Sequence, residues 1–437
     1  MKFFRKRYKN CCPFGGFWAT FSTNKFLESR GFHIWRTNDT LLIRNFKYSR
    51  TYKRPIVINI FQPMLGWKEL KAVKEVFASN WIGTGPKTEE FQKNFSEFIG
   101  VDREQVMMTN SCTEGMFQII EFCKNKYKWH NTIPFEVIIP TIGFVGASNA
   151  VISNGGTPVF CDVDERSLNV TVEDIKKHIT HRTTAVMLIH YAGWTCDMKP
   201  IIDLCEEQGI ILIEDNACSV ASTYKGKATG TLGDYGVWSF DAMKTLVMGD
   251  GSIVYGREPK DVEEISTQSY LGLLSDSGYS NTVDKKWWEY DISSPGRRSV
   301  VNDITSAIGL VQLERLNSFI HARKTRHEMY DDMLKDVSWI KTPLPIVTSK
   351  DSKSSYYMYW IQLEDEQTRD ELAMYLKKND IYTTFRYYPL HLVPYYQSTE
   401  QLPNAERASR NTLCLPLHQG LDSNEIQYVT DKIKDFK

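Results

Sequence analysis

Two kinds of hydrophobic pattern alternate along the chain from about residue 59 to its end. Short apolar runs that are rich in β-branched and aromatic residues predict strands, and apolar residues at a helical spacing predict helices. The strand runs cover residues 105–108, 136–140, 157–164, 185–193, 209–217, 235–240 and 251–256, and the helical segments cover 73–80, 89–100, 114–123, 171–179 and 198–208. This alternation predicts an α/β fold around a mostly parallel, doubly wound sheet that is covered on both faces.

Polar and charged residues stand where several of the strand runs end. In doubly wound sheets, functional groups gather at the carboxyl ends of the strands. The stretch MMTNSCTEGMFQ (residues 107–118) combines a strand, a polar turn and a helix start, whose backbone N–H groups suit a phosphate. On this stretch alone we favour a capping box of Ser111 and Glu114, which needs no ligand.

Three further strand ends carry candidate chemistry. Phe144 can stack on a planar ring, although taken alone it is more typical of a core residue. Glu214 and Asp215 fit a buried carboxylate with a positive partner as well as they fit an N-cap. Ser239 and Lys244 follow the run 235–240. A lone lysine there is usually a solvated charge, but its amine can also bond to a carbonyl cofactor.

Together, these strand ends meet the needs of one cofactor, pyridoxal 5′-phosphate (PLP). Its phosphate requires backbone donors and hydroxyls, its ring an aromatic face, its pyridine nitrogen a carboxylate and its aldehyde an amine. The chain offers all four, each after its own strand run. The set therefore favours Lys244 as a residue that binds the cofactor rather than as a surface charge.

The composition is that of a globular protein, and it favours neither a metal site nor a disulfide framework. The 437 residues are 42% hydrophobic and 24% charged, which suits two or three domains. Nine cysteines are scattered without a CxxC pair, so a zinc site and a disulfide framework are both poor interpretations. Reduced thiols in a cytoplasmic enzyme fit better. We also expect no membrane span, because no apolar run is long enough.

The net charge of zero hides an asymmetry between the two ends of the chain. Residues 1–54 hold 13 Lys and Arg against two acids, a balance of +11, which leaves −11 on the remainder. The mildly acidic body argues against nucleic-acid binding. The basic N-terminus lacks the apolar region of a secretory signal, so we expect a disordered or targeting extension. An organelle transit peptide is another interpretation of this segment. An arm that binds nucleic acid or a membrane surface is a further, less favoured interpretation.

From about Phe61 to Phe436, the chain resembles the DegT/DnrJ/EryC1/StrS family of PLP-dependent sugar aminotransferases. The resemblance is carried by GWKELKAVKEVFASNWIGTGPKTEEFQKNFSEFIG, IPTIGFVGASNAVISNGGTPVFCDVD, IHYAGWTCDMKPIIDLCEEQGIILIEDNA, SAIGLVQLERL, YYPLHLVPYY and AERASRNTLCLPLH. Their order and spacing match the family over some six-sevenths of the chain. The resemblance implies fold type I of PLP enzymes, which is aspartate aminotransferase-like, with a smaller C-terminal α/β domain.

The resemblance also implies roles for individual residues. Lys244 matches the lysine that bonds to the cofactor's aldehyde, and Asp215 matches the acid that pairs with the pyridine nitrogen. Phe144 falls where the family stacks an aromatic side chain on the ring. Thr113 and Glu114 fall in the turn that binds the phosphate, largely through backbone N–H groups.

Three further positions complete the implied cofactor site. Ser239 matches a hydroxyl that contacts the phosphate. Cys218 stands where the family usually has Gln or His near the phenolic oxygen of the ring, and cysteine is a weaker hydrogen-bonding group. Arg298 replaces an Asn that reaches the phosphate from the neighbouring subunit, a role that arginine can fill with charge-assisted bonds. A surface arginine in a loop is the alternative.

These implied roles predict an aminotransferase for amino-sugar or polysaccharide biosynthesis. We expect glutamate as the donor and a nucleotide-linked keto-deoxysugar as the acceptor. We also expect ping-pong kinetics and a homodimer with shared active sites. A PLP-fold protein that binds a sugar or a partner without transamination is the alternative, and the intact pair of Lys244 and Asp215 speaks against it. We expect an extension over 1–58, a large domain over 59–320 and a small domain over 321–437.

Overall fold

The computed structural model describes residues 33–37, 40–44, 57–129, 134–274, 290–344 and 352–437. The chain divides into two units, Met1–Val57 and Ile58–Lys437, each of which is described by itself. In the first unit, β1 (His33–Thr37) pairs antiparallel with β2 (Thr40–Arg44). Most of the predicted basic extension lies outside the described residues.

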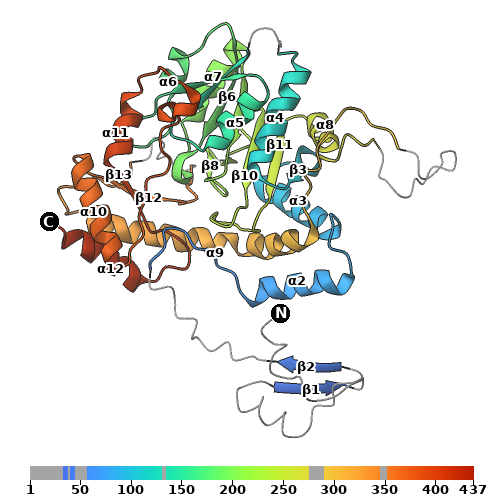
Figure 1. Cartoon of the computed structure of the whole chain (residues 1–437), viewed down its shortest axis with the longest axis horizontal. Coiled ribbons are helices and arrows are strands. Elements are labelled where there is room, and N and C mark those ends of the chain that lie inside the picture. The colour runs from blue at the N-terminus through green and yellow to red at the C-terminus, as the bar shows by residue number, and fades with distance from the viewer. Residues whose placement is uncertain (1–32, 38–39, 45–56, 130–133, 275–289, 345–351) are drawn as a thin grey trace, which may run out of the picture. The chain divides into compact units, whose positions relative to one another are not determined.

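A seven-stranded sheet forms the centre of the second unit (Figure 1). Its strands are β3 (Val106–Thr109), β4 (Glu136–Pro140), β5 (Thr157–Cys161), β6 (Thr183–Ile189), β7 (Ile211–Asp215), β10 (Tyr235–Ser239) and β11 (Ser252–Gly256). Their order is β3-β11-β10-β7-β6-β4-β5, and β11 runs antiparallel to both of its neighbours while the other pairs are parallel. The predicted α/β fold with a mostly parallel sheet is confirmed.

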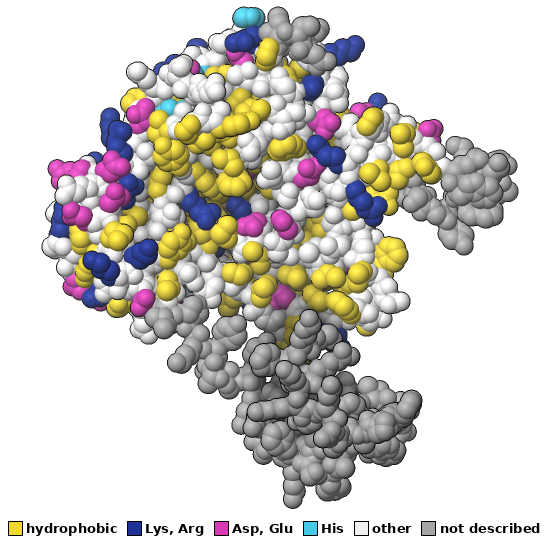
Figure 2. All heavy atoms as spheres, in the orientation of Figure 1, with side chains coloured by type: hydrophobic (Ala, Val, Ile, Leu, Met, Phe, Trp, Pro, Cys, Tyr) yellow, Lys and Arg dark blue, Asp and Glu magenta, His cyan; other side chains and the backbone are white. Residues whose placement is uncertain are grey.

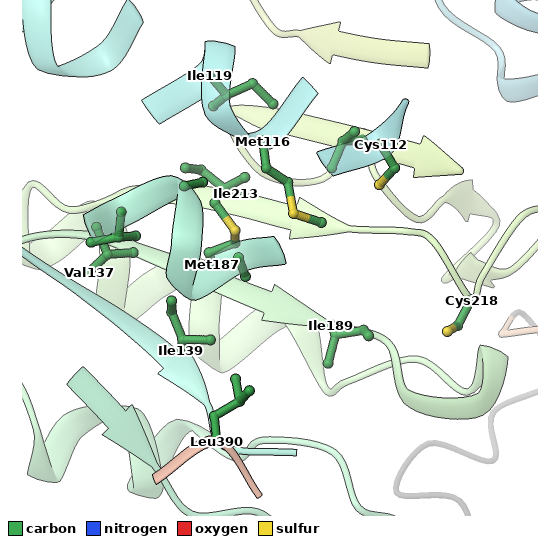
Figure 3. Close-up of a cluster of buried hydrophobic side chains, with 14 of the residues drawn as sticks. Cys112, Met116, Ile119, Val137, Ile139, Met187, Ile189, Ile213, Cys218 and Leu390 are labelled. Carbon is green, nitrogen blue, oxygen red and sulfur yellow. The ribbon is translucent and has the colours of Figure 1, made fainter. Parts of the chain in front are cut away.

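Helices cover both faces of this sheet, which explains why its strands are apolar on both sides. On one face, α4 (Cys112–Lys126), α5 (Val145–Ser153) and α8 (Pro259–Ser269) pack over the sheet in one core. Figure 3 shows side chains of this core, with Met116 and Ile119 of α4 above Met187 of β6 and Ile213 of β7.

Two further cores fill the other face. One joins α3 (Pro86–Ile99) and the first half of α9 (Asp303–Leu334) to the strands β3, β10 and β11. The second joins α6 (Val172–Lys177) and α7 (Met198–Gln208) to β4, β6 and β7. The remaining elements before α9 are α2 (Trp67–Ser79), η1 (Arg103–Gln105), η2 (Tyr191–Gly193), β8 (Thr223–Tyr224) and β9 (Lys227–Ala228).

The C-terminal part has a hydrophobic core of its own. Its elements are β12 (Tyr359–Gln362), α10 (Glu366–Lys378), η3 (Leu390–Leu392), η4 (Pro394–Tyr396), α11 (Pro403–Asn411), β13 (Thr412–Leu415) and α12 (Ser423–Lys434). The second half of α9 packs into this core through Tyr330 and Leu334, whereas its first half packs into the sheet core through Leu313 and Leu316. The predicted domain boundary at 320/321 therefore falls within a continuous helix.

Local sequence sets the ends of the helices that matter for the site. Ser111 is the N-cap of α4, and its hydroxyl accepts the backbone N–H of Glu114 at 3.2 Å. The reciprocal half of the predicted capping box is missing, because the Glu114 carboxylate binds other side chains. Among the described residues, no helix is long and apolar enough to cross a membrane.

Candidate active site

Five of the predicted residues meet in one pocket of about 270 Å³. They are Thr113, Phe144, Asp215, Ser239 and Lys244. Thr113 and Phe144 follow β3 and β4, Asp215 and Ser239 are the last residues of β7 and β10, and Lys244 lies in the turn after β10. The pocket thus lies at the carboxyl edge of the parallel strands, where the pattern predicted it.

A wider cavity of about 640 Å³ lies elsewhere in the second unit. Trp194, Trp238 and Lys324 line it among others, and none of the predicted residues does. We place the active site in the smaller pocket because that pocket combines the amine of Lys244 with the buried carboxylate of Asp215.

Asp215 is the buried acid of this pocket, with 3% of its surface exposed. The backbone N–H of Ala217 donates to its Oδ1 at 2.9 Å, and no other hydrogen bond to this carboxylate is found in the part of the chain that the structure describes. Burial raises the pKa of the Asp215 carboxyl, against the lowering effects of the Ala217 N–H and of Lys244. A carboxylate in this position lacks a strong donor, and the protonated ring nitrogen of a cofactor would supply one.

The neighbouring Glu214 is used quite differently. Its carboxylate accepts the backbone N–H groups of Gly230 (2.8 Å), Leu232 (2.7 Å) and Gly233 (2.7 Å). His190 Nε2 lies 3.0 Å from the same group. Because the Cys196 N–H donates to His190 Nδ1, Nε2 carries the proton that is donated to Glu214. Glu214 is therefore a structural acid. No helix lies among the described residues between β7 and β8, so the bond from the Ala217 N–H to Asp215 closes a turn and does not cap a helix.

Lys244 is partly buried, and aromatic and sulfur groups surround its amine. Its Nζ lies 5.3 Å from the ring centroid of Tyr357. Burial lowers the pKa of Lys244, but Tyr357, Tyr387, Cys218 and Cys112 outweigh it and leave that pKa well above its ordinary value. In the described part of the chain no carboxylate forms an ion pair with this amine, so it remains available to a ligand in the pocket.

The N-terminus of α4 forms the predicted phosphate side of the pocket. Ser111, Cys112 and Thr113 line the pocket there, and Ser239 at the end of β10 lines the same pocket. Backbone N–H groups and the helix dipole at such an end favour an anion. Glu114 does not line the pocket. Its backbone N–H donates to the Ser111 hydroxyl, and its carboxylate lies 2.9 Å from the guanidinium of Arg297.

Phe144 has 48% of its surface exposed. Its ring centroid lies 5.9 Å from that of Tyr387, with the planes inclined at 57°. An aromatic face left open to a pocket suits the stacking of a planar ring. The core interpretation of Phe144 is therefore the weaker one.

Besides Glu114, two predicted residues lie outside the lining of the pocket. Cys218 is buried behind it, with its Sγ 3.7 Å from the Tyr387 hydroxyl. Arg298 lies on a loop, where its guanidinium stacks 5.1 Å from the ring centroid of Tyr270. Within a single chain, Arg298 thus takes no part in the pocket.

Sequence reasoning missed several lining residues, above all Arg386 and Tyr387. They come from the segment after α10, far along the chain from the strand ends. The guanidinium of Arg386 lies 4.7 Å from the ring centroid of Phe61 and 3.5 Å from the sulfur of Met243. The segment YYPLH, which begins at Tyr387, carried part of the family resemblance, but nothing in it singled out Tyr387, and Arg386 precedes it.

The chemical groups that line this pocket match those that PLP requires. The pocket offers an amine, a buried carboxylate short of a donor, an exposed aromatic face and a helix N-terminus beside a hydroxyl. In the described ranges, no group of three or more His, Cys, Asp or Glu side chains could hold a metal ion.

Comparison with known proteins decides the family. Residues 63–434 match the DegT/DnrJ/EryC1/StrS aminotransferase family. The chain belongs to this family. A relative from Saccharopolyspora spinosa, dTDP-4-dehydro-2,3,6-trideoxy-D-glucose 4-aminotransferase, is 44% identical over 382 residues, which are 86% of this chain and 96% of the relative.

Solved structures of the family agree with the fold. The aminotransferase TlmJ from Streptoalloteichus hindustanus matches with a TM-score of 0.80 at 44% identity, over 87% of this chain and 98% of TlmJ. The PMP form of Spr1654 from Streptococcus pneumoniae matches with a TM-score of 0.78 at 25% identity, over 87% of this chain and 97% of that chain. The chain is therefore a PLP-dependent sugar aminotransferase of fold type I, as the sequence predicted.

Proposed function

We propose that this aminotransferase moves the amino group of glutamate to the 4-keto carbon of a deoxysugar linked to a nucleoside diphosphate. Glutamate leaves as 2-oxoglutarate, and the keto-sugar becomes the amino-sugar, so that one amine and one carbonyl change places. The observation that carries this proposal is the 44% identity to the Saccharopolyspora spinosa 4-aminotransferase over 96% of that enzyme. The pocket that combines Lys244 with Asp215 supports it.

Each residue of the pocket has a stated task in this proposal. Bound PLP supplies an aldehyde that carries the amino group and a ring that takes up electrons. Asp215 would pair with the ring nitrogen, Phe144 would stack on the ring, and Thr113 and Ser239 with the start of α4 would hold the phosphate. Lys244 Nζ removes the proton from Cα of glutamate and later delivers one to the sugar carbon.

The donor and the order of the reaction can be tested in two half-reactions. Purified protein loaded with PLP should release 2-oxoglutarate from glutamate without any sugar, and it should then aminate dTDP-4-keto-deoxyhexoses in a separate step. Initial rates should give parallel lines in double-reciprocal plots. Intersecting lines without a glutamate half-reaction would contradict the proposed donor and order.

We further propose a homodimer in which Arg298 of one subunit completes the active site of the other. Arg298 stands apart from the pocket of its own chain, where it rests on Tyr270. Large apolar side chains are exposed along α2 and just after it, namely Leu70 (51%), Phe77 (63%), Trp81 (56%) and Ile82 (55%). Figure 2 shows hydrophobic side chains gathered over this helix. An apolar surface of this kind suits contact with a second copy.

Complementation tests the shared site directly. The variants Lys244→Ala and Arg298→Ala should each be nearly inactive as homodimers. After subunit exchange, a mixed dimer has one site in which both residues are intact, so equal mixtures should recover up to about a quarter of the original activity. No recovery in mixtures whose mixed dimers are demonstrated would contradict a shared site.

We place the enzyme in the cytoplasm. The seven cysteines that the structure describes are free and buried, which suits a reducing compartment. A fusion of the full chain to a fluorescent protein would test this placement, and fluorescence in another compartment would contradict it.

A further inference from the structure

The segment from Arg386 to His391 is fixed against the sheet at both of its ends. At the first end, the Tyr191 hydroxyl donates to the backbone carbonyl of Arg386. At the other end, the N–H of Leu390 donates to the carbonyl of Thr141 at 2.8 Å, and His391 Nδ1 lies 2.7 Å from the Thr141 hydroxyl. Leu390 itself packs into the hydrophobic core near Ile139 (Figure 3).

Tyr387 projects from this fixed segment into the pocket. It lines the pocket together with Lys244 and Asp215, and its ring contacts that of Phe144. Its hydroxyl lies 3.7 Å from Cys218 Sγ, a long contact to a weak partner. The Tyr387 phenol thus lies between Phe144, which is predicted to stack on the cofactor ring, and Cys218, which replaces the usual Gln or His.

Both groups are close to the amine that binds the cofactor. Tyr387 and Cys218 are among the groups that raise the pKa of Lys244. On the PLP ring, the phenolic oxygen is attached next to the carbon that bears the aldehyde. A donor for that oxygen must therefore lie near Lys244.

We propose that the Tyr387 hydroxyl donates the hydrogen bond to the phenolic oxygen of PLP, in place of the Gln or His that Cys218 has replaced. This inference rests on the tasks proposed above for Lys244 and Asp215. An O–H group is a stronger donor than an S–H group, and a rigid segment presents it at fixed geometry. Tyr387 comes from the C-terminal part of the chain, whereas position 218 follows β7, so two distant segments share one task.

The surroundings of Tyr387 keep its phenol competent as a donor. Burial raises the pKa of the Tyr387 phenol well above its ordinary value, so that it holds its proton at neutral pH. The other titratable and charged groups that act on it are Cys218, Lys244, Tyr357 and Arg386. Burial also raises the pKa of the Cys218 thiol.

The test is a pH titration of the visible spectrum of the PLP-loaded protein. A hydrogen bond to the phenolic oxygen stabilises its deprotonated form and thereby lowers the pH at which the absorption band changes. Removing the donor with Tyr387→Phe should raise this midpoint by about one pH unit. The matched control is Tyr388→Phe, a change at the neighbouring tyrosine, which is 59% exposed, and its midpoint should stay where it is in the original protein.

Two changes at position 218 separate the phenol from the thiol. Cys218→Ala should leave the midpoint within about 0.3 pH units, since the thiol is the weaker donor. Cys218→Gln in the Tyr387→Phe background should bring the midpoint back towards the original value. An unchanged midpoint in Tyr387→Phe, or a shift in Cys218→Ala alone, would overturn the assignment.

The outcome also separates this inference from the proposed function. A protein that gains no visible band with PLP would overturn both. A protein that gains the band, converts glutamate and keeps the same midpoint after Tyr387→Phe would overturn the role of Tyr387 and leave the proposed function standing.

Discussion

Glu214 and Asp215 are neighbours at the end of β7, but their carboxylates lie in two regions that differ in the number of hydrogen-bond donors. Glu214 points into a closed region between β7 and the loop 230–233, where it receives donors from three backbone N–H groups and from His190. Asp215 points to the other face, into the pocket, where the structure shows one hydrogen bond, from Ala217. Alternation along a strand sends neighbouring side chains to opposite faces, so consecutive carboxylates can differ completely in role.

The closed region is built around a glycine. Gly230 has a φ of +90°, and a Cβ there would lie 2.3 Å from the ring of Trp238. Only a residue without a side chain lets the loop bring its N–H groups onto Glu214. The pocket instead leaves Asp215 with one donor. Burial raises the pKa of its carboxyl, and a cationic partner would stabilise the charged form. The comparison teaches that a buried carboxylate whose hydrogen bonds are all made within the protein has a structural role. A buried carboxylate with a single donor is instead the one that faces the cofactor pocket.

The largest effect on the open side is expected from Lys244→Ala. Loss of the amine removes both the attachment of the cofactor and the proton carrier, so activity should fall about 10⁴-fold or more. The free energy of unfolding of the cofactor-free protein should change by less than about 1 kcal/mol, because Lys244 has no ion pair among the described residues. Activity assays and urea denaturation measure the two quantities. Lys199→Ala, at an exposed lysine, is the control, and an active Lys244→Ala enzyme would contradict the assignment.

The opposite outcome is expected on the closed side. Glu214→Ala leaves three buried N–H groups and His190 without their acceptor, so we expect the free energy of unfolding to drop by about 3–5 kcal/mol. Glu214→Gln retains one acceptor oxygen and should cost less. Urea denaturation followed by circular dichroism checks both values. A loss below about 1 kcal/mol for Glu214→Ala would erase the distinction between the two acids.

The hydrophobic pattern alone predicted the strand end but not which of the two acids faces the pocket. Period and turn residues located β7, and the family resemblance assigned Asp215, yet the partners of Glu214 come from a loop whose path depends on tertiary packing. Tyr387 and Arg386 escaped for the same reason, because they reach the pocket from a segment about 140 residues beyond Lys244. Local sequence patterns predict the strands and turns that carry site residues. They do not predict which distant segment of the chain folds over those residues.

A third change separates activity from stability at the pocket acid. Asp215→Asn keeps the shape of the side chain and removes its charge, so kcat/KM should fall about 10²- to 10³-fold. The cofactor-free variant should be at least as stable as the original, since a buried carboxylate with one donor is replaced by a neutral group. Steady-state kinetics and thermal unfolding test this pair of expectations. A large loss of stability would mean that Asp215, like Glu214, is a structural acid.

The smallest expected effect is that the change in the free energy of unfolding caused by Asp215→Asn depends on pH. The folded-state pKa of Asp215 lies above its ordinary value of 3.8, so the folded cofactor-free protein binds this proton more tightly than the unfolded chain. The contribution of Asp215 to stability is therefore highest at low pH and is lost as the pH rises through the folded-state pKa. Asn does not titrate, so the advantage of Asp215→Asn over the original protein should grow as the pH rises from about 4 to about 7. Urea denaturation of both cofactor-free proteins at the two pH values measures this difference. An advantage that shrinks with rising pH would mean that Asp215 already has a strong partner in the empty pocket, and the contrast between the two acids would then disappear.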